Sequence, residues 1–98
     1  MSGKYILNGK EVIKCNDLMK WAKWFEKADR HVAKDTVNDS DISTVFLGLD
    51  HQFGSGPPLL FETLVFGGTL DQEMDRYETW DQAEKGHLAM IARVKAEK

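Results

Sequence analysis

Apolar residues recur at every third or fourth position in two segments of the chain, and this spacing predicts two amphipathic helices. The first helix is expected over residues 17–29, with Asn16 as its amino-terminal cap. The second is expected to begin at Thr79, because Thr79 and Gln82 fit a capping box that satisfies two backbone amides at a helix start. Each helix carries an apolar stripe that another element has to cover, and a sheet is the expected cover.

Shorter apolar runs, separated by turn residues, predict strands in the rest of the chain. Residues 5–14 are expected to form a hairpin, because Asn8-Gly9 is a strong two-residue turn signal between apolar runs. Two longer runs in the middle of the chain are almost continuously apolar. This indicates burial on both faces, or one covered face and a contact surface on the other. The further strands are expected at residues 31–37, 42–49, 59–66 and 76–78.

This order of elements predicts an α+β fold, with a mostly antiparallel sheet of about four to six strands and two helices packed on one face. The 98 residues are expected to form a single domain, since domains commonly contain ~100–150 residues. Two helices on one face would leave the opposite face of the sheet uncovered. Side chains such as Phe46, Phe61 or Phe66 pointing to that face would form an exposed apolar patch, and such patches usually mark interaction sites.

Three residues within these elements allow more specific predictions: Glu62 in the second central run, and Gly86 and His87 in the second helix. Glu62 interrupts an apolar run, where a carboxylate has to be paired or solvated. A solvent-facing position is the favoured interpretation, and a buried acid is the alternative. His87 lies on the inner stripe of the second helix and is expected to be a hydrogen-bonded core histidine. Gly86 lowers helix propensity by ~1 kcal/mol, which indicates close packing against the sheet.

Composition and charge narrow the classes of function. Hydrophobic residues at 42% and charged residues at 30% are ordinary for a soluble globular protein. The formal net charge is −3, and the densest basic group, Lys20, Lys23 and Lys27, has the spacing of a solvated helix face. Nucleic-acid binding is therefore not expected, because nucleic-acid binders commonly carry a basic face.

The same sequence argues against membrane and disulfide classes. No apolar run approaches the ~20 residues of a membrane span, so no membrane contact is expected. The chain does not begin with the pattern of a secretory signal, which makes the cytoplasm the expected location. Cys15 is the only cysteine, which excludes a disulfide within the chain and a zinc site built from several cysteines.

The polar segment between the two central runs contains most of the candidate binding residues, namely Asp50, His51, Phe53, Gly54 and Gly56. A connection over residues 50–58 is longer than the ~2–5 residues usual for hairpin loops, and this extra length is the hint of function. Asp50 could orient a basic His51 imidazole, and the glycines could let backbone amides approach an anion. Ordinary loop and capping roles explain the same residues with fewer assumptions.

His31 completes the set of candidate residues. It follows Asp29 and Arg30 directly after the first helix, in a second small polar cluster. If this cluster met Asp50 and His51, the four side chains of Asp29, His31, Asp50 and His51 could bind a metal or act in acid–base catalysis. Nothing in the order of the residues shows that the two clusters meet. No catalytic residue is assigned, and neither a metal nor a cofactor is expected.

Two segments of the chain carry a family resemblance: WAKWFEKADRHVA at residues 21–33 and STVFLGLDH at residues 43–51. With them, most of the chain resembles a group of small uncharacterised proteins encoded by tailed bacteriophages and prophages. The group has no established activity that could be transferred to residues of this chain. The resemblance implies a phage-encoded accessory protein that acts in the bacterial cytoplasm, and it does not imply an enzyme.

Two hypotheses of different class follow. The leading one is a non-enzymatic binding or self-associating module, with a protein partner or a second copy in a homodimer. It would bind through the uncovered sheet face and the loop at residues 50–58. The alternative is a small-ligand or nucleotide-binding protein, with hydrolysis as a conceivable activity, whose site lies around His31, Asp50 and His51.

Overall fold

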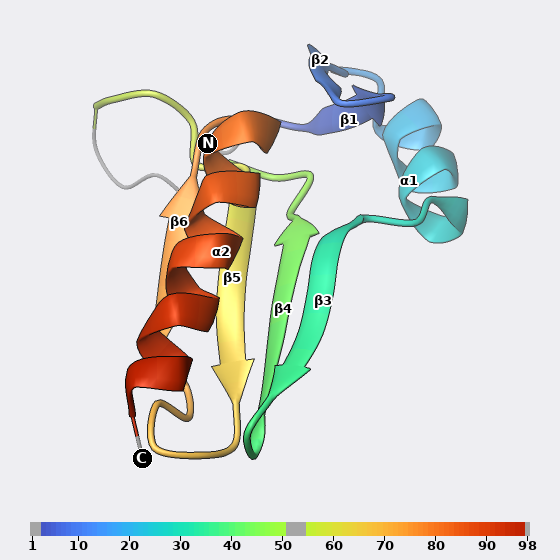
Figure 1. Cartoon of the computed structure of the whole chain (residues 1–98). Helices are drawn as coiled ribbons and strands as arrows, with labels where there is room; N and C mark the ends of the chain where they lie inside the picture. Colours follow the sequence, from blue (N-terminus) through green and yellow to red (C-terminus); the bar gives the residue numbers. More distant parts are fainter. Residues whose placement is uncertain (1–2, 51–54, 98) are drawn as a thin grey trace.

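The computed structural model describes residues 3–50 and 55–97 and confirms the predicted α+β class. Within these residues the strands form two antiparallel sheets, one of two strands and one of four (Figure 1). The elements, in chain order, are β1 (Tyr5–Asn8), β2 (Glu11–Lys14), α1 (Leu18–Lys27), β3 (His31–Val37), β4 (Ser40–Phe46), β5 (Phe61–Phe66), β6 (Met74–Tyr77) and α2 (Trp80–Ala96).

The four-stranded sheet is a meander in the order β3-β4-β5-β6, and α2 lies across one of its faces (Figure 1). The buried side chains of α2 are spaced three or four residues apart, as the apolar pattern of the sequence predicted. Met90 and Val94 pack on Ile42 of β4 and Val65 of β5 and form one core cluster. Because consecutive strand residues point to opposite faces, this packing fixes which residues of every strand face α2.

A second core cluster lies where β4 and β5 meet the amino-terminal end of α2. Its buried members are Phe46, Leu60, Phe61 and Ala83. Phe46 and Phe61 are fully buried and in contact, with ring centroids 5.2 Å apart. The prediction that they could point to the uncovered face is therefore wrong, since both lie on the α2 side of the sheet.

The first helix lies beside the four-stranded sheet rather than across it, and its Trp24 reaches the core cluster on the side that α2 covers. α1 projects to one side together with the β1–β2 hairpin (Figure 1). The Trp21 indole N–H donates to the carbonyl oxygens of Tyr5 and Gly48, each at 3.1 Å. Trp24 meets the edge of the Phe46 ring at 5.7 Å. An apolar stripe shows that a helix needs a cover, and it does not say which element supplies it.

The cap of α1 and the turn of the first hairpin each lie one residue further along the chain than predicted. The cap of α1 is Asp17 rather than Asn16, and its carboxylate accepts the amides of Met19 and Lys20. The first hairpin turns at Gly9 and Lys10 instead of Asn8 and Gly9, since Asn8 pairs with Glu11. Gly9 has a φ of 65°, which suits the first central position of a two-residue turn.

The cap of α2 is the predicted Thr79, whose hydroxyl accepts the Gln82 amide at 3.2 Å. The Gln82 side chain in turn accepts the backbone amide of Glu78 at 2.9 Å. The capping box therefore reaches one residue further back than its usual form.

Candidate functional site

The predicted loop site falls partly outside the described residues. His51, Phe53 and Gly54 lie outside them, so the prediction that they bind a ligand stays a prediction. Asp50 is described: its carboxylate accepts the backbone amide of Leu59 at 3.0 Å, and its own amide donates to the Gly3 carbonyl. Asp50 thus ties together the two ends of the segment that joins β4 to β5, which is a structural role of the capping kind. Gly56 lies in an exposed bend of that segment.

His31 is the first residue of β3 and is half exposed. Its backbone amide and its ring Nδ1 both contact the Asp29 carboxylate, at 3.1 and 3.2 Å. The backbone hydrogen bond is the main reason why the pKa of Asp29 lies below its usual value, and the ring contact adds to it. Across residues 3–50 and 55–97, no three histidine, cysteine or carboxylate side chains are placed to hold a metal ion together.

The face of the sheet opposite α2, called here the open face, presents three cross-strand rows of side chains. The first row contains His31, Val45, Glu62 and Arg76, the second Lys34, Ser43, Leu64 and Met74, and the third Thr36, Asp41 and Phe66. Of the described elements, α2 alone packs across this sheet, and it packs on the other side. The predicted uncovered face is therefore present in the described part of the molecule.

The apolar side chains of the open face gather on β5 and β6. Phe66 and Met74 are exposed to 46% and 44%, although both belong to residue types that are normally buried. Leu64 lies between them, opposite Met74 in the register and two residues from Phe66 on the same strand. Val45 adds a half-buried side chain on β4. These four residues form a mixed surface with the polar residues of β3 and β4, comparable in character to non-obligate protein interfaces.

Glu62 also lies on the open face, where it is paired rather than free in solvent. Arg76 Nε donates to Glu62 Oε2 at 3.0 Å, and both side chains are largely covered. The guanidinium supplies the partner that a carboxylate in an apolar run requires. Both interpretations of Glu62 made from the sequence were therefore incomplete, because Arg76 reaches it only through the β5–β6 register.

A buried chain of polar groups lies on the other face, beneath α2. His87 Nε2 is 2.7 Å from the Asp35 carboxylate, and His87 Nδ1 is 2.7 Å from the Thr44 hydroxyl. Thr44 contacts Thr63 at 2.5 Å, and the Tyr77 hydroxyl donates to Thr63 at 3.1 Å. A neutral imidazole protonated on Nε2 satisfies the whole chain, because each hydroxyl then donates to the next acceptor toward His87. The prediction of a hydrogen-bonded core histidine is confirmed.

The order carboxylate, imidazole, hydroxyl resembles a catalytic relay, yet this one is closed to substrates. Thr44 and Thr63 have no exposed surface, and His87 is 2% exposed. A nucleophile has to reach the atom that it attacks, so the Thr44 hydroxyl is a structural partner of His87. Burial is the main cause of the raised pKa of Tyr77 at the far end of the chain. Gly86 makes room for that ring, since a Cβ there would collide with Tyr77, which confirms its predicted close packing.

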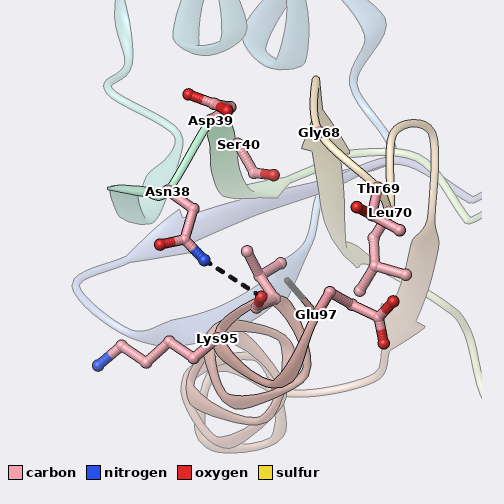
Figure 2. A pocket seen from close by; sticks show the side chains of 9 residues that line it. Asn38, Asp39, Ser40, Gly68, Thr69, Leu70, Lys95 and Glu97 are labelled. Atoms are coloured by element: carbon pink, nitrogen blue, oxygen red, sulfur yellow. Dashed lines mark hydrogen bonds between the residues drawn. The ribbon is translucent and has the colours of Figure 1, made fainter.

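A hollow of about 450 Å³ lies at the end of the molecule where α2 finishes (Figure 2). The lining residues are Asn38, Asp39, Ser40, Gly68, Thr69, Leu70, Val94, Lys95 and Glu97. Its volume is within the ~300–1,000 Å³ range of ligand pockets. Figure 2 shows the side chains of Asp39 and Lys95 extending away from the hollow, however, so its charged groups do not converge on one point. Of the predicted binding residues that the structure describes, His31, Asp50 and Gly56, none lines it.

Of the apolar residues on the open face, Phe66 was predicted by name from the sequence, whereas Val45, Leu64 and Met74 were not. The signal that could have found them is the strict alternation of β4 and β5, which two buried threonines conceal. Thr44 and Thr63 place polar residues inside while apolar residues point outward, so the sequence shows no clean alternation of apolar and polar positions.

Comparisons with known proteins identify no relative of this chain. Neither the protein-family models, nor the curated proteins, nor the solved structures contain a match to the chain. In the described ranges, neither α1 nor α2 has the length and apolar character that a membrane crossing requires. The function therefore has to be inferred from the site residues themselves.

Proposed function

We propose that this protein is a non-catalytic binding module that docks a folded protein through the open face of its sheet. The observation that carries the proposal is the exposure of Phe66 and Met74 on a face that α2 leaves uncovered. On the resemblance to phage-encoded proteins, the proposal assigns this partner to the bacterial cytoplasm.

Three features support the open face over the other surfaces. Its apolar residues are contiguous in the strand register, whereas the exposed Leu88 stands on the outer side of α2. Its two cations and two anions balance in charge, and Glu62 and Arg76 already neutralise each other. Three of its four apolar residues, Val45, Leu64 and Phe66, belong to the central strands β4 and β5, which hold the side chains in fixed positions before a partner arrives. Such preorganisation lowers the entropic cost of association.

A site-specific photo-crosslinking experiment tests the proposal. A photoreactive phenylalanine analogue replaces Phe66 in one variant and Leu88 in the matched control, because both positions are exposed and apolar but only Phe66 is on the open face. In bacterial lysate, the variant at position 66 is expected to form defined cross-linked protein adducts in several-fold higher yield than the control. An excess of unlabelled wild-type protein should suppress these adducts, and an excess of Leu64→Glu should not.

Equal yields at the two positions would contradict the proposal, as would equal suppression by both competitors. The circular dichroism melting curve of each variant shows whether the fold is retained. The substitutions are on the surface, so only small changes in stability are expected.

A further inference from the structure

We propose that α1 of one copy of this chain docks on the outer side of α2 of a second copy. The contact brings together two charged surfaces of opposite sign. The basic face of α1 is defined by Lys20, Lys23 and Lys27, and the acidic face of α2 by Asp81 and Glu84. Both surfaces are separate from the open face, so this inference does not depend on the proposed function.

Charge is divided unevenly along the chain. Residues 1–30, which contain the hairpin and α1, carry 7 of the 13 cationic side chains but 4 of the 16 carboxylates, so their formal charge is +3. Residues 31–98 therefore carry −6, since the whole chain carries −3. α1 stands to one side of the molecule with the hairpin, apart from α2 (Figure 1). A molecule with a positive arm and a negative body is complementary in charge to its own copies.

The basic face of α1 follows from the way the helix is attached. Trp21 turns toward the hairpin, where its indole donates a hydrogen bond. Lys20, Lys23 and Lys27 are three and four residues apart and all exposed, so they line up along the solvent side of the helix. α1 contains one carboxylate, which leaves this side positive. Met19, one turn before Lys23, is 67% exposed beside the lysines.

The acidic face of α2 lies on the side that is turned away from the sheet. Asp81, Glu84 and Leu88 are three and four residues apart and all exposed, so they share one face. Leu88 is 66% exposed. Lys85 is the one cation between residues 80 and 90. The exposed Asp75, on the α2 side of β6, adds a further carboxylate to this end of the molecule.

The two faces match each other in kind and differ in sign. Each sets an exposed apolar side chain, Met19 or Leu88, beside its charges. With Leu18, these are the large apolar side chains that the described residues expose outside the open face. An acidic protein of another kind would match α1 but leave the face of α2 unexplained. A second copy accounts for both surfaces with one contact, and every molecule supplies both halves at equal concentration.

The contact joins two different surfaces, so it is heterologous. Such contacts produce closed rings or open chains of copies. Two helix faces are expected to bury less than the ~1,200 Å² found at the lower limit of stable interfaces, which makes this a weak and transient association. Because exposed charges supply much of the attraction, the association should also depend on salt.

Sedimentation of the purified chain at two ionic strengths is the first test. The wild type is expected to associate at least ~10-fold more strongly in about 20 mM than in about 500 mM salt, because the screening length falls from ~20 Å to ~4 Å. Lys20→Glu with Lys23→Glu should weaken the association at least ~10-fold in low salt. The matched control is Lys34→Glu with Lys95→Glu, which makes the same change in net charge on the open face and at the far end of α2. Its effect should stay within about threefold.

A charge exchange tests whether the partner is a second copy. Asp81→Lys with Glu84→Lys reverses the acidic face of α2 and should also leave a monomer. An equal mixture of this variant and the α1 variant with Lys20→Glu and Lys23→Glu is expected to associate again. In that mixture, α1 of each variant meets an α2 face of opposite sign. Melting curves of both variants show that each is folded.

Methionine oxidation gives a residue-level readout of the same contact. Met19 lies beside the basic face of α1 and Met74 on the open face, and they are exposed to 67% and 44%. As the wild-type concentration rises in low salt, oxidation of Met19 by dilute peroxide should slow several-fold. Oxidation of Met74 should stay constant. The α1 variant should lose the protection of Met19.

A wild type that stays monomeric at high concentration in low salt overturns the inference, and so does an association that salt leaves unchanged. It also fails if the control variant associates as weakly as the α1 variant, or if the mixture of reversed variants stays monomeric. Protection of Met74 instead of Met19 would contradict it and place the second copy on the open face. The cross-linking control at Leu88 is unaffected, because the chain is dilute in lysate and this contact is weak.

Discussion

The two helices of this protein show how differently an apolar stripe can be used. α2 contacts all four strands of the large sheet and buries Ala83, His87, Met90 and Val94. α1 has no buried residue, and its first turn exposes Leu18 and Met19 to 57% and 67%. Both helices have an amphipathic sequence, so the difference comes from the surfaces that they meet. A broad sheet face covers one whole side of α2. The β1–β2 hairpin and the segment that follows β4 cover only part of the apolar stripe of α1.

The attachment of α1 is aromatic and local. Phe25 stacks on Trp21 with centroids 4.7 Å apart, and the Arg30 guanidinium lies 4.1 Å from the centroid of the Phe25 ring. Arg30 also donates to the Phe46 carbonyl at 2.9 Å. A few specific contacts therefore hold α1, while many interdigitated side chains hold α2. The α2–sheet half should behave as the stable unit and the α1–hairpin half as the part that opens first.

The largest expected effect compares two methionines, one in each helix. Met90→Ala removes a side chain that is 98% covered beneath α2 and should lower the free energy of unfolding by about 2–5 kcal/mol. Met19→Ala, at an exposed position of α1, should change it by less than about 0.5 kcal/mol. Urea denaturation of both variants measures the difference. Similar losses at the two positions would show that α1 is as deeply integrated as α2.

The second prediction examines the attachment of α1 through two glycines with positive φ. Gly9 at 65° has open space around it, whereas a Cβ on Gly48 at 77° would lie 2.9 Å from the Phe25 ring. Both alanine substitutions incur the backbone cost of ~1–2 kcal/mol for the left-handed conformation. Gly48→Ala should destabilise by about 1–3 kcal/mol more, because Phe25 has to move. Hydrogen exchange should then accelerate in α1 and not in α2. If the two variants lose the same stability, the contact with the Phe25 ring does not contribute.

The third prediction concerns the polar chain beneath α2. Thr44→Val keeps the shape of the side chain but leaves His87 Nδ1 without its hydrogen-bond partner, and it should lower stability by about 1–3 kcal/mol. Thr36→Val is the control, since Thr36 donates to Asp41 at the exposed end of the open face. That change should stay within about 0.5 kcal/mol. Thermal or urea unfolding measures the stability of both variants. If Thr44→Val leaves the free energy of unfolding unchanged, the buried chain of polar groups adds nothing to the docking of α2.

The smallest expected effect lies at the junction of the two halves. The His31 backbone amide lowers the pKa of Asp29 below its ordinary value of 3.8, with a further contribution from the His31 ring. A carboxyl with a lowered folded pKa adds stability above its unfolded pKa and loses it as the pH falls through the folded pKa. Asp29 should therefore titrate below 3.8 in an NMR titration, and Asp29→Asn should reduce the acid sensitivity of β3 pairing near His31. A normal titration of Asp29 would contradict this account.

The sequence was sufficient where the determinants are local. The strand at residues 31–37, the hairpin at Gly9 and the cap at Thr79 follow from turn and capping preferences that involve neighbouring residues. The buried role of His87 was also predictable, because its position on the apolar stripe of α2 is a matter of helical spacing. The loop that contains Asp50 and Gly56 was predicted as a segment. The hydrogen bond between Asp50 and Leu59 could not be predicted, because it depends on the path of the chain between β4 and β5.

What the sequence by itself determined is the set of elements, their class and the need for each apolar stripe to be covered, because periodicity and short-range chemistry act along the chain. Tertiary structure decided which stripe met the sheet, which phenylalanines turned inward, and how Leu64, Phe66 and Met74 came to lie together on the open face. The physical reason is that strand register and helix placement follow from side chains far apart in sequence. Pairs such as Glu62 with Arg76 and Thr44 with His87 become neighbours only when the sheet and α2 assemble.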